Sequence, residues 1–433
     1  MNHPLWRPLR HLHAFRRHIS SSRPFIPGDH VLLREVPPRN TSPIFTRPLK
    51  PGRRIETHRG LILHDDIIGK YPRELVSSQL SRRRSQDGKE PRGTNYRIHE
   101  VKLEEYVRLS RRLVTPIYPA DAALIVELLD LHPGALHQQH LQPSEDSESE
   151  HVPPKLEILE AGTGHGALTL YLARALHAAN AHLPPPPSDP TALATWKGTR
   201  PAILHTLDIS ARYSAHAQAT ITTFRHGLYT PTIDFHVSSP SPWIRAALAS
   251  PERGGKSFLS HVILDLPNAD AQLADVVKGV RDDGTVVVFN PSVTQILDCL
   301  ERVKQEGLAL ELEKVVELGA GGGSGGREWD CRFVKPRAGR GSEADVGGEK
   351  VMEESGSGSE GDVSGEETGD GVDAEGEKEV REPQAKPTSE RSGQKEWAMV
   401  CRPKVGERIV GGGFVGVFRK LREASKDQSA GDM

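Results

Sequence analysis

The chain has 433 residues, which allows two or three domains at roughly 150 residues each. Hydrophobic residues make up 36% of it and the formal net charge is -2. The sequence has no apolar run of about 18 residues, which excludes a membrane-spanning helix. Three widely spaced cysteines, Cys299, Cys331 and Cys401, exclude a disulfide framework and a four-thiolate zinc site. These features predict a soluble protein of a reducing compartment.

The first 27 residues have the composition of a targeting segment, because they contain no Asp or Glu. Their arginines are Arg7, Arg10, Arg16, Arg17 and Arg23, and their regularly spaced apolar residues are Leu5, Leu9, Leu12, Phe15 and Ile19. An acid-free, arginine-rich segment with one apolar helical face is typical of a mitochondrial transit peptide. A nucleic-acid-binding arm would not need the apolar face. We therefore predict a transit peptide over residues 1–27 and a location in the mitochondrial matrix, with the nucleus or cytoplasm as the alternative.

Residues 28–114 predict a small β domain. Short β-rich runs at 30–34, 54–58 and 60–63 are separated by Gly and Pro. Helical periodicity then appears at 103–113 and 120–131.

From residue 115 onward, strands and helices alternate. Strands are predicted at 156–159, 202–207, 233–237, 261–265 and 285–289, with helices that include 167–177 and 211–224. This alternation indicates an α/β domain whose mostly parallel sheet is covered by helices on both faces. Two polar or proline-rich inserts interrupt it, at 137–155 and 181–200, and the four prolines at 184–187 predict a surface loop for the second.

An acidic segment divides the end of this domain. Of the 56 basic and 58 acidic residues, 4 and 16 lie between 341 and 390, so the rest of the chain has a net charge of +10. A mildly basic body suits an anionic partner. Residues 337–395 predict a disordered acidic insertion, and β character resumes near 397–401 and 414–418. We therefore assign 115–336 and 396–422 to one domain, and 423–433 to a flexible tail.

Three alternating glycines occur where a strand turns into a helix, in Glu160-Ala-Gly-Thr-Gly-His-Gly166. Glycine lets a backbone approach a ligand closely, and the spacing is neither that of a dinucleotide fold nor that of a phosphate loop. An acidic residue before the glycines suits S-adenosylmethionine (SAM), which carries an ammonium and a sulfonium; a tight turn without a ligand is the alternative. The predicted cofactor-binding residues here are Glu160, Gly162, Thr163, Gly164, His165 and Gly166.

Two aspartates end later strands of the predicted sheet. Asp208 is placed to bind ribose hydroxyls of a cofactor, or alternatively to cap the next helix. Asp265 ends the strand beside the glycine turn, at the sheet edge where substrates meet cofactors. The histidines show no spacing typical of a metal site, so no metal is predicted.

In this order the motifs resemble the tRNA (adenine-58-N1)-methyltransferase family. The matching segments are His58-Arg-Gly60 with His64-Asp-Asp-Ile-Ile-Gly69-Lys70, Tyr96-Arg97, Leu103-Glu-Glu-Tyr106, Ile117-Tyr118-Pro119-Ala-Asp121-Ala122, the glycine turn, Leu264-Asp265-Leu-Pro267, Asn290-Pro-Ser-Val-Thr-Gln295 and Arg327-Glu-Trp329. They cover about 28–335 and 397–420. The resemblance implies a catalytic subunit of fungal mitochondrial type, with a Rossmann-like class I SAM-dependent methyltransferase domain built on a mostly parallel seven-stranded sheet.

The resemblance also implies roles for single residues. Asp265 would accept a hydrogen bond from the adenine N6 amine and face the cationic product, and Tyr118 and Pro267 would contact the substrate. Ser239 stands where the family has a carboxylate for the SAM adenine, and Asn268 follows Pro267 where the family has a Pro-Trp pair.

The implied cofactor is SAM and the implied partner is tRNA, in a homotetramer or in a heterotetramer with a non-catalytic paralogous subunit. Two alternatives remain open. The chain could itself be a non-catalytic RNA-binding subunit, or it could be a class I methyltransferase that acts on a protein or a small molecule.

Overall fold

The computed structural model describes residues 23–37, 42–79, 93–133, 154–180, 189–319, 329–334, 398–403 and 412–422. The predicted transit peptide up to residue 22, the acidic insertion 337–395 and the tail 423–433 lie outside these ranges. The chain divides into two units, Met1–Gly326 with Ile409–Met433, and Arg327–Arg408. The second is described through one antiparallel pair, β13 (Trp329–Val334) and β14 (Ala398–Pro403).

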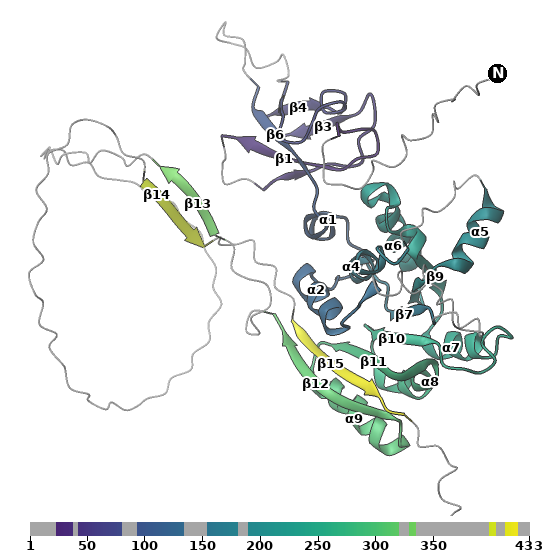
Figure 1. The fold of residues 1–433 in the computed structure, drawn as a ribbon. Coiled ribbons are helices and arrows are strands. Elements are labelled where there is room, and N and C mark those ends of the chain that lie inside the picture. Colours follow the sequence, from purple (N-terminus) through teal and green to yellow (C-terminus); the bar gives the residue numbers. More distant parts are fainter. Residues whose placement is uncertain are drawn as a thin grey trace, which may run out of the picture. The chain divides into compact units, whose positions relative to one another are not determined.

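A small β domain comes first in the chain, as the sequence predicted (Figure 1). Its four-stranded sheet has the order β2-β1-β6-β5 and its two-stranded sheet pairs β3 with β4. The strands are β1 (Val31–Val36), β2 (Ile44–Phe45), β3 (Arg54–Thr57), β4 (Gly60–Leu63), β5 (Leu75–Ser77) and β6 (Asn95–Glu100). Val31, Leu33, Tyr96 and Ile98 alternate along β1 and β6 and form the core on one face, so the side chains between them lie on the other.

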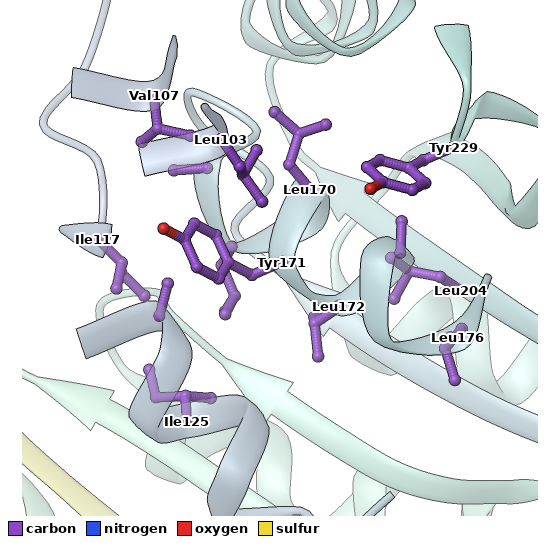
Figure 2. Packing of buried hydrophobic residues seen from close by; sticks show 14 of the residues in the cluster. Leu103, Val107, Ile117, Ile125, Leu170, Tyr171, Leu172, Leu176, Leu204 and Tyr229 are labelled. Atoms are coloured by element: carbon purple, nitrogen blue, oxygen red, sulfur yellow. The ribbon is translucent and has the colours of Figure 1, made fainter. Parts of the chain in front are cut away.

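Two helices link this domain to the larger sheet, α1 (Leu103–Leu109) and α2 (Pro119–Leu128). The first is shorter than the predicted 103–113, because Ser110 takes an extended backbone conformation and ends it. Leu103 and Val107 of α1 belong to the same core cluster as Leu170 of the larger sheet's first helix (Figure 2).

The larger sheet confirms the predicted α/β class. Its order is β12-β15-β11-β10-β7-β8-β9. The strands are β7 (Leu156–Ala161), β8 (Ala202–Asp208), β9 (Ile233–Val237), β10 (Leu259–Leu264), β11 (Val280–Asn290), β12 (Leu310–Leu318) and β15 (Gly413–Lys420). The neighbours from β11 to β9 run parallel, whereas β15 is antiparallel to both β11 and β12.

Helices cover both faces of this sheet, because its buried strands are apolar on both sides. Ile263 and Val287 face the cluster that holds α2 and α4, whereas Leu264 and Val288 face α7, α8 and α9. The helices are α4 (Ala167–Leu176), α6 (Ala211–Thr223), α7 (Pro240–Leu248), α8 (Leu273–Gly279) and α9 (Val293–Glu306), with short 3-10 turns at Phe224–Gly227, Thr230–Thr232 and Ala269–Gln272. Within the described ranges, no helix combines the length and apolar character needed to cross a membrane.

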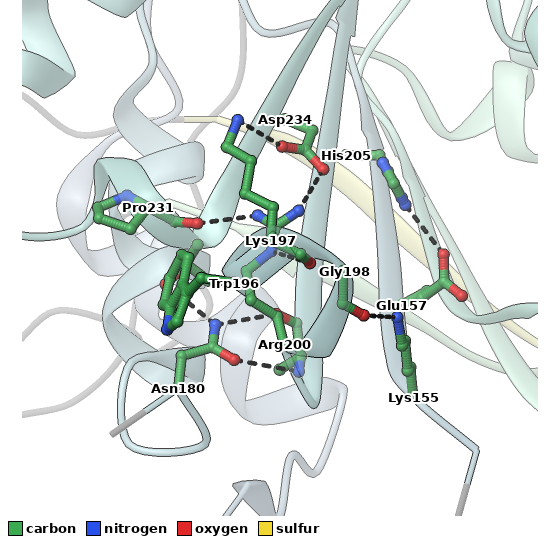
Figure 3. A network of polar contacts seen from close by, with 12 residues as sticks. Lys155, Glu157, Asn180, Trp196, Lys197, Gly198, Arg200, His205, Pro231 and Asp234 are labelled. Carbon is green, nitrogen blue, oxygen red and sulfur yellow. Dashed lines mark hydrogen bonds and ion pairs between the residues drawn. The ribbon is translucent and has the colours of Figure 1, made fainter. Parts of the chain in front are cut away.

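The predicted surface loop at 181–200 is wrong in its second half, which forms helix α5 (Pro190–Thr199). Asp189 caps its first turn by accepting a hydrogen bond from the Ala192 amide, and Pro190 suits a first helical position. Arg200 then fixes the helix end: its guanidinium is 2.7 Å from the Asp234 carboxylate on β9 and donates to the Pro231 carbonyl (Figure 3).

Candidate functional site

A small cavity lies at the carboxyl ends of β7 and β10. Its lining residues are Thr115, Pro116, Ile117, Glu160, Gly162, Thr163, Gly164, His165, Ala167, Leu168 and Asp265. The volume of about 20 Å³ is room for about one water molecule. The structure therefore brings five of the predicted cofactor residues and the predicted catalytic aspartate to one place.

The three glycines of the turn all have positive φ angles, +102° at Gly162, +52° at Gly164 and +81° at Gly166. A Cβ on Gly162 would lie 1.9 Å from the carbonyl oxygen of Asp265, and one on Gly166 would lie 3.1 Å from Ile221 of α6. Contacts inside the protein thus require glycine at 162. At 166, they leave little room for a Cβ. From the sequence, a close approach to a ligand or a tight turn without one is expected; the structure adds these contacts with Asp265 and Ile221.

Glu160 lies at the inner end of the cavity and is 1% exposed. Its carboxyl group accepts hydrogen bonds from the hydroxyls of Thr169 and Thr206, each at 2.7 Å. Burial raises its pKa to about 8, and the nearby Asp265 and Asp208 add to the shift. A cation placed beside this carboxyl group would favour its ionised form.

Asp265 directly follows β10, whose last residue pairs with Ala161. Its amide donates to the Ala161 carbonyl at 2.8 Å, so the strand end is fixed against the glycine turn. Burial raises the pKa of Asp265 to about 7. Two carboxyl groups whose pKa values are raised by burial in one cavity are typical of a functional site.

Asp208 ends β8 and fastens the glycine turn to the next helix. Its carboxylate accepts from the Gly164 amide at 3.0 Å and from the Ser210 amide at 2.8 Å. Ser210, and not Asp208, caps α6, because its hydroxyl accepts from the Tyr213 amide; the helix-cap alternative for Asp208 is therefore wrong. Its predicted contact with ribose stays a prediction.

Thr163 and His165 complete the turn, and both side chains are buried. The Thr163 hydroxyl lies 2.7 Å from the Thr206 hydroxyl. Among the residues that the structure describes, none forms a hydrogen bond with either ring nitrogen of His165. Burial, together with His216 and Arg112, lowers the pKa of His165 to about 4, so the imidazole is neutral at physiological pH.

Five predicted site residues do not line the cavity: Gly166 and Asp208, described above, and Tyr118, Ser239 and Pro267. Tyr118 precedes α2, and the Arg112 guanidinium lies 5.6 Å from its ring centre. Ser239 is the residue before α7, and Pro267 is exposed in the loop after β10.

The sequence argument missed Thr115 and Pro116, which form the cavity wall opposite the glycine turn, although the family segment beginning at Ile117 adjoins them. It also missed Ile209 and Val237, which are 79% and 57% exposed at the carboxyl ends of β8 and β9. Large exposed apolar side chains at this edge suit contact with a flat apolar ligand surface.

Among the described residues, no group of three or more His, Cys, Asp or Glu side chains is placed to hold a metal ion.

Comparison with known proteins supports the resemblance. Two curated proteins, each named tRNA (adenine(58)-N(1))-methyltransferase TrmI and from two strains of Thermus thermophilus, are 26% identical to this chain over 284 residues. The match covers 66% of this chain and 82% of each relative. Over this length the chain is similar to the tRNA (adenine-58-N1)-methyltransferases. No family model matches it.

A solved structure shares the fold. A SAM-dependent O-methyltransferase from Thermotoga maritima superposes with a TM-score of 0.51 and 14% identity, covering 94% of this chain and 99% of that one. The tRNA (m1A58) methyltransferase TrmI from Aquifex aeolicus gives a TM-score of 0.48 and 15% identity, covering 92% of this chain and 100% of that one. At such identity, the Thermotoga likeness supports the fold and leaves the substrate to other arguments.

Proposed function

We propose that this chain is a SAM-dependent tRNA methyltransferase that forms N1-methyladenosine at position 58. The observation that carries the proposal is the meeting of Asp265 with the glycine turn in one cavity at the sheet edge. The sequence similarity to the TrmI proteins over most of their length supplies the substrate class.

The chain's residues fit SAM as the methyl donor. The glycine turn leads into the start of α4, where backbone N–H groups favour an anionic group such as the donor's carboxylate. Glu160 offers a carboxyl group for the donor's ammonium, and Asp208 ends the neighbouring strand where a ribose would lie. Bound SAM supplies an electrophilic methyl group on a sulfonium.

Asp265 is the proposed catalytic residue. Adenine N1 has a lone pair at neutral pH, so the protein needs mainly to align the base and exclude water. The methylated ring is cationic, and a fixed carboxylate beside it lowers the barrier. With a pKa of about 7, Asp265 is largely ionised under mildly alkaline conditions, in the form that can accept from the N6 amine.

The decisive experiment replaces Asp265 with Asn in the full chain. Methylation of a tRNA transcript that carries adenosine at position 58 should fall by at least about a hundredfold, because the negative charge that faces the cationic product is lost. SAM affinity, measured by calorimetry, should stay within about threefold of the unchanged protein, because the glycine turn and Glu160 remain. Asp270→Asn, a few residues further along, is the matched control and should keep full activity.

The same assays separate the alternatives. A chain that binds no SAM would be a non-catalytic subunit, and one that methylates protein but not tRNA would be a methyltransferase of another class. Full tRNA methylation by the Asp265→Asn protein would refute the assigned role.

The proposal includes a mitochondrial location and an oligomeric assembly. The acid-free, arginine-rich first 27 residues support import into the mitochondrial matrix. The resemblance supports a tetramer, of this chain alone or with a paralogous subunit, which light scattering of the purified protein would distinguish by mass.

A further inference from the structure

The face of the N-terminal sheet opposite its own core gathers arginines around one histidine, next to the buried Leu32. Arg34 on β1 lies directly opposite Arg97 on β6 in the antiparallel register. Arg73, in the turn before β5, donates from its guanidinium to the His99 ring at 2.8 Å, and Arg97 donates to the Arg73 carbonyl at 3.0 Å. We call Arg34, Arg73, Arg97 and His99 the arginine face.

Three features of the arginine face are unfavourable for the folded protein when no ligand is bound. Like charges directly opposite on neighbouring strands repel each other. Arg73 has a φ angle of +79°, a conformation that side chains other than glycine, asparagine and aspartate rarely adopt. Burial, with the charges of Arg73 and Arg34, lowers the pKa of His99 to about 4. An anion bound at this face would relieve the repulsion.

Carboxylates of the described residues compensate this charge only in part. Glu105 on α1 pairs with Arg34 at 2.9 Å. Glu74 is directed elsewhere, since it accepts from the Tyr71 amide at 2.8 Å and lies 3.7 Å from the Lys70 ammonium. No ion pair joins Arg73 or Arg97 to a carboxylate in the part of the chain that the structure describes, so their charges are available to a ligand.

Exposed apolar side chains adjoin the arginine face. Tyr71, in the same turn as Arg73, is 49% exposed, and Leu75, directly opposite Arg97, is 42% exposed. An exposed aromatic ring beside arginines is typical of surfaces that bind unpaired nucleotides, where a base stacks on the ring and guanidinium groups hold the phosphates.

We infer that the arginine face binds the sugar-phosphate backbone of the tRNA substrate, with Tyr71 contacting a nucleotide beside it. The inference rests on the proposed function and adds the surface through which the N-terminal domain holds the RNA. Arginine suits this role because its planar guanidinium can donate two parallel hydrogen bonds to one phosphate.

The test compares the unchanged chain with Arg97→Gln and with Arg34→Gln/Arg97→Gln. The measurement is the dissociation constant for an unmodified tRNA transcript, by fluorescence anisotropy at several KCl concentrations. Each arginine removed should weaken binding about three- to tenfold near 0.1 M salt and lower the slope of log affinity against log salt by about one. Arg97→Lys keeps the charge but loses the planar guanidinium that can donate two parallel hydrogen bonds. It should therefore give an intermediate affinity.

Arg54→Gln is the matched control, because Arg54 lies in the same domain on β3 and its side chain is 62% exposed. It should leave tRNA affinity unchanged. SAM affinity should stay at its unchanged value in every variant, because the arginine face lies on the small sheet and not on the strands that line the cavity. The melting temperature of Arg97→Gln should not fall, because this change removes one of two opposed charges.

The outcomes separate the two proposals. If the unchanged chain methylates tRNA and the double variant binds the transcript as tightly as Arg54→Gln does, the inference is overturned while the proposed function stands. If the unchanged chain neither binds nor methylates tRNA, the proposed function fails and the inference with it. A rise in the His99 pKa when the transcript is added, followed by NMR, would support contact with phosphate directly.

Discussion

At the scale of single residues, Gly162 holds the glycine turn close to the end of β10. Replacement by Ala would combine a φ angle of +102° with a Cβ only 1.9 Å from the Asp265 carbonyl oxygen. We expect Gly162→Ala to lower the free energy of unfolding by about 3 kcal/mol or more. Urea denaturation would measure it.

Gly307 provides the comparison for that change. It follows α9 with a φ angle of +59°, and a Cβ there would meet nothing within 4 Å. Gly307→Ala should cost only about 1 kcal/mol, from the left-handed backbone alone. Equal losses in the two variants would show that the close approach to Asp265 does not constrain residue 162.

The cavity carboxyl groups predict how stability depends on pH. The pKa values of Glu160 and Asp265 are raised to about 8 and about 7, from about 4 in an unfolded chain. Between these limits the folded protein binds more protons than the unfolded chain, so these two groups make stability fall as pH rises from about 5 to about 8. Buried His165 and His261, with pKa values lowered to about 4, act in the opposite sense below about pH 6.5.

The variant Glu160→Gln/Asp265→Asn keeps all the histidines. Their effect therefore cancels when its free energy of unfolding is compared with that of the unchanged chain. Glu160→Gln/Asp265→Asn should gain stability over the unchanged chain as pH rises from about 5 to about 8. Urea denaturation at several pH values measures this difference. A difference that stays constant with pH would mean that neither carboxyl group is protonated in the folded protein near neutrality.

At the scale of elements, helix α5 is attached to the sheet edge through Arg200. The Arg200 side chain is 3% exposed and pairs with Asp234, whereas Lys197 is 43% exposed and lies 3.5 Å from the same carboxylate. We expect Arg200→Ala to lower the free energy of unfolding by about 2 kcal/mol, because Asp234 loses its buried partner. Lys197→Ala should change it by about 0.5 kcal/mol or less. Thermal denaturation of the two variants tests the contrast, and similar losses would contradict it.

The elements that sequence reasoning found are those with strong periodicity. The apolar strands β7, β8 and β10 were predictable because parallel strands are buried on both faces and read as continuous apolar runs. Helix α5 was not predictable from the sequence. None of its residues is buried, and the prolines before it indicate a loop more strongly than Asp189-Pro190 indicates a helix start. Polar contacts at its end, rather than an apolar face, hold it in place.

At the scale of the whole molecule, the site was predictable where strand ends defined it. Glu160 and Asp265 end neighbouring parallel strands, so a parallel sheet alone brings them together. The wall formed by Thr115 and Pro116 depends on how a linker folds back over the turn, which no local pattern encodes. The arginine face likewise depends on the register that sets Arg34 opposite Arg97.

The predicted transit peptide belongs to the scale of the whole molecule, because it would decide the compartment in which the protein works. Residues 1–27 fused to a fluorescent protein should direct it into mitochondria, because import requires a basic, amphipathic segment. Fluorescence microscopy beside a matrix marker is the measurement. The same fusion with its five arginines changed to Gln should stay in the cytosol, and retention of the unchanged fusion there would favour the nuclear or cytoplasmic alternative.

The last strand of the larger sheet, β15, lies between β11 and β12 and hydrogen-bonds to both. During synthesis, β12 therefore has no neighbour among the described strands of the sheet until residues 413–420 leave the ribosome. Until then the unpaired edges of β11 and β12 are exposed to other chains, which makes nascent molecules dependent on chaperones. A message cut short anywhere before that strand would yield a product for degradation rather than a weakened enzyme.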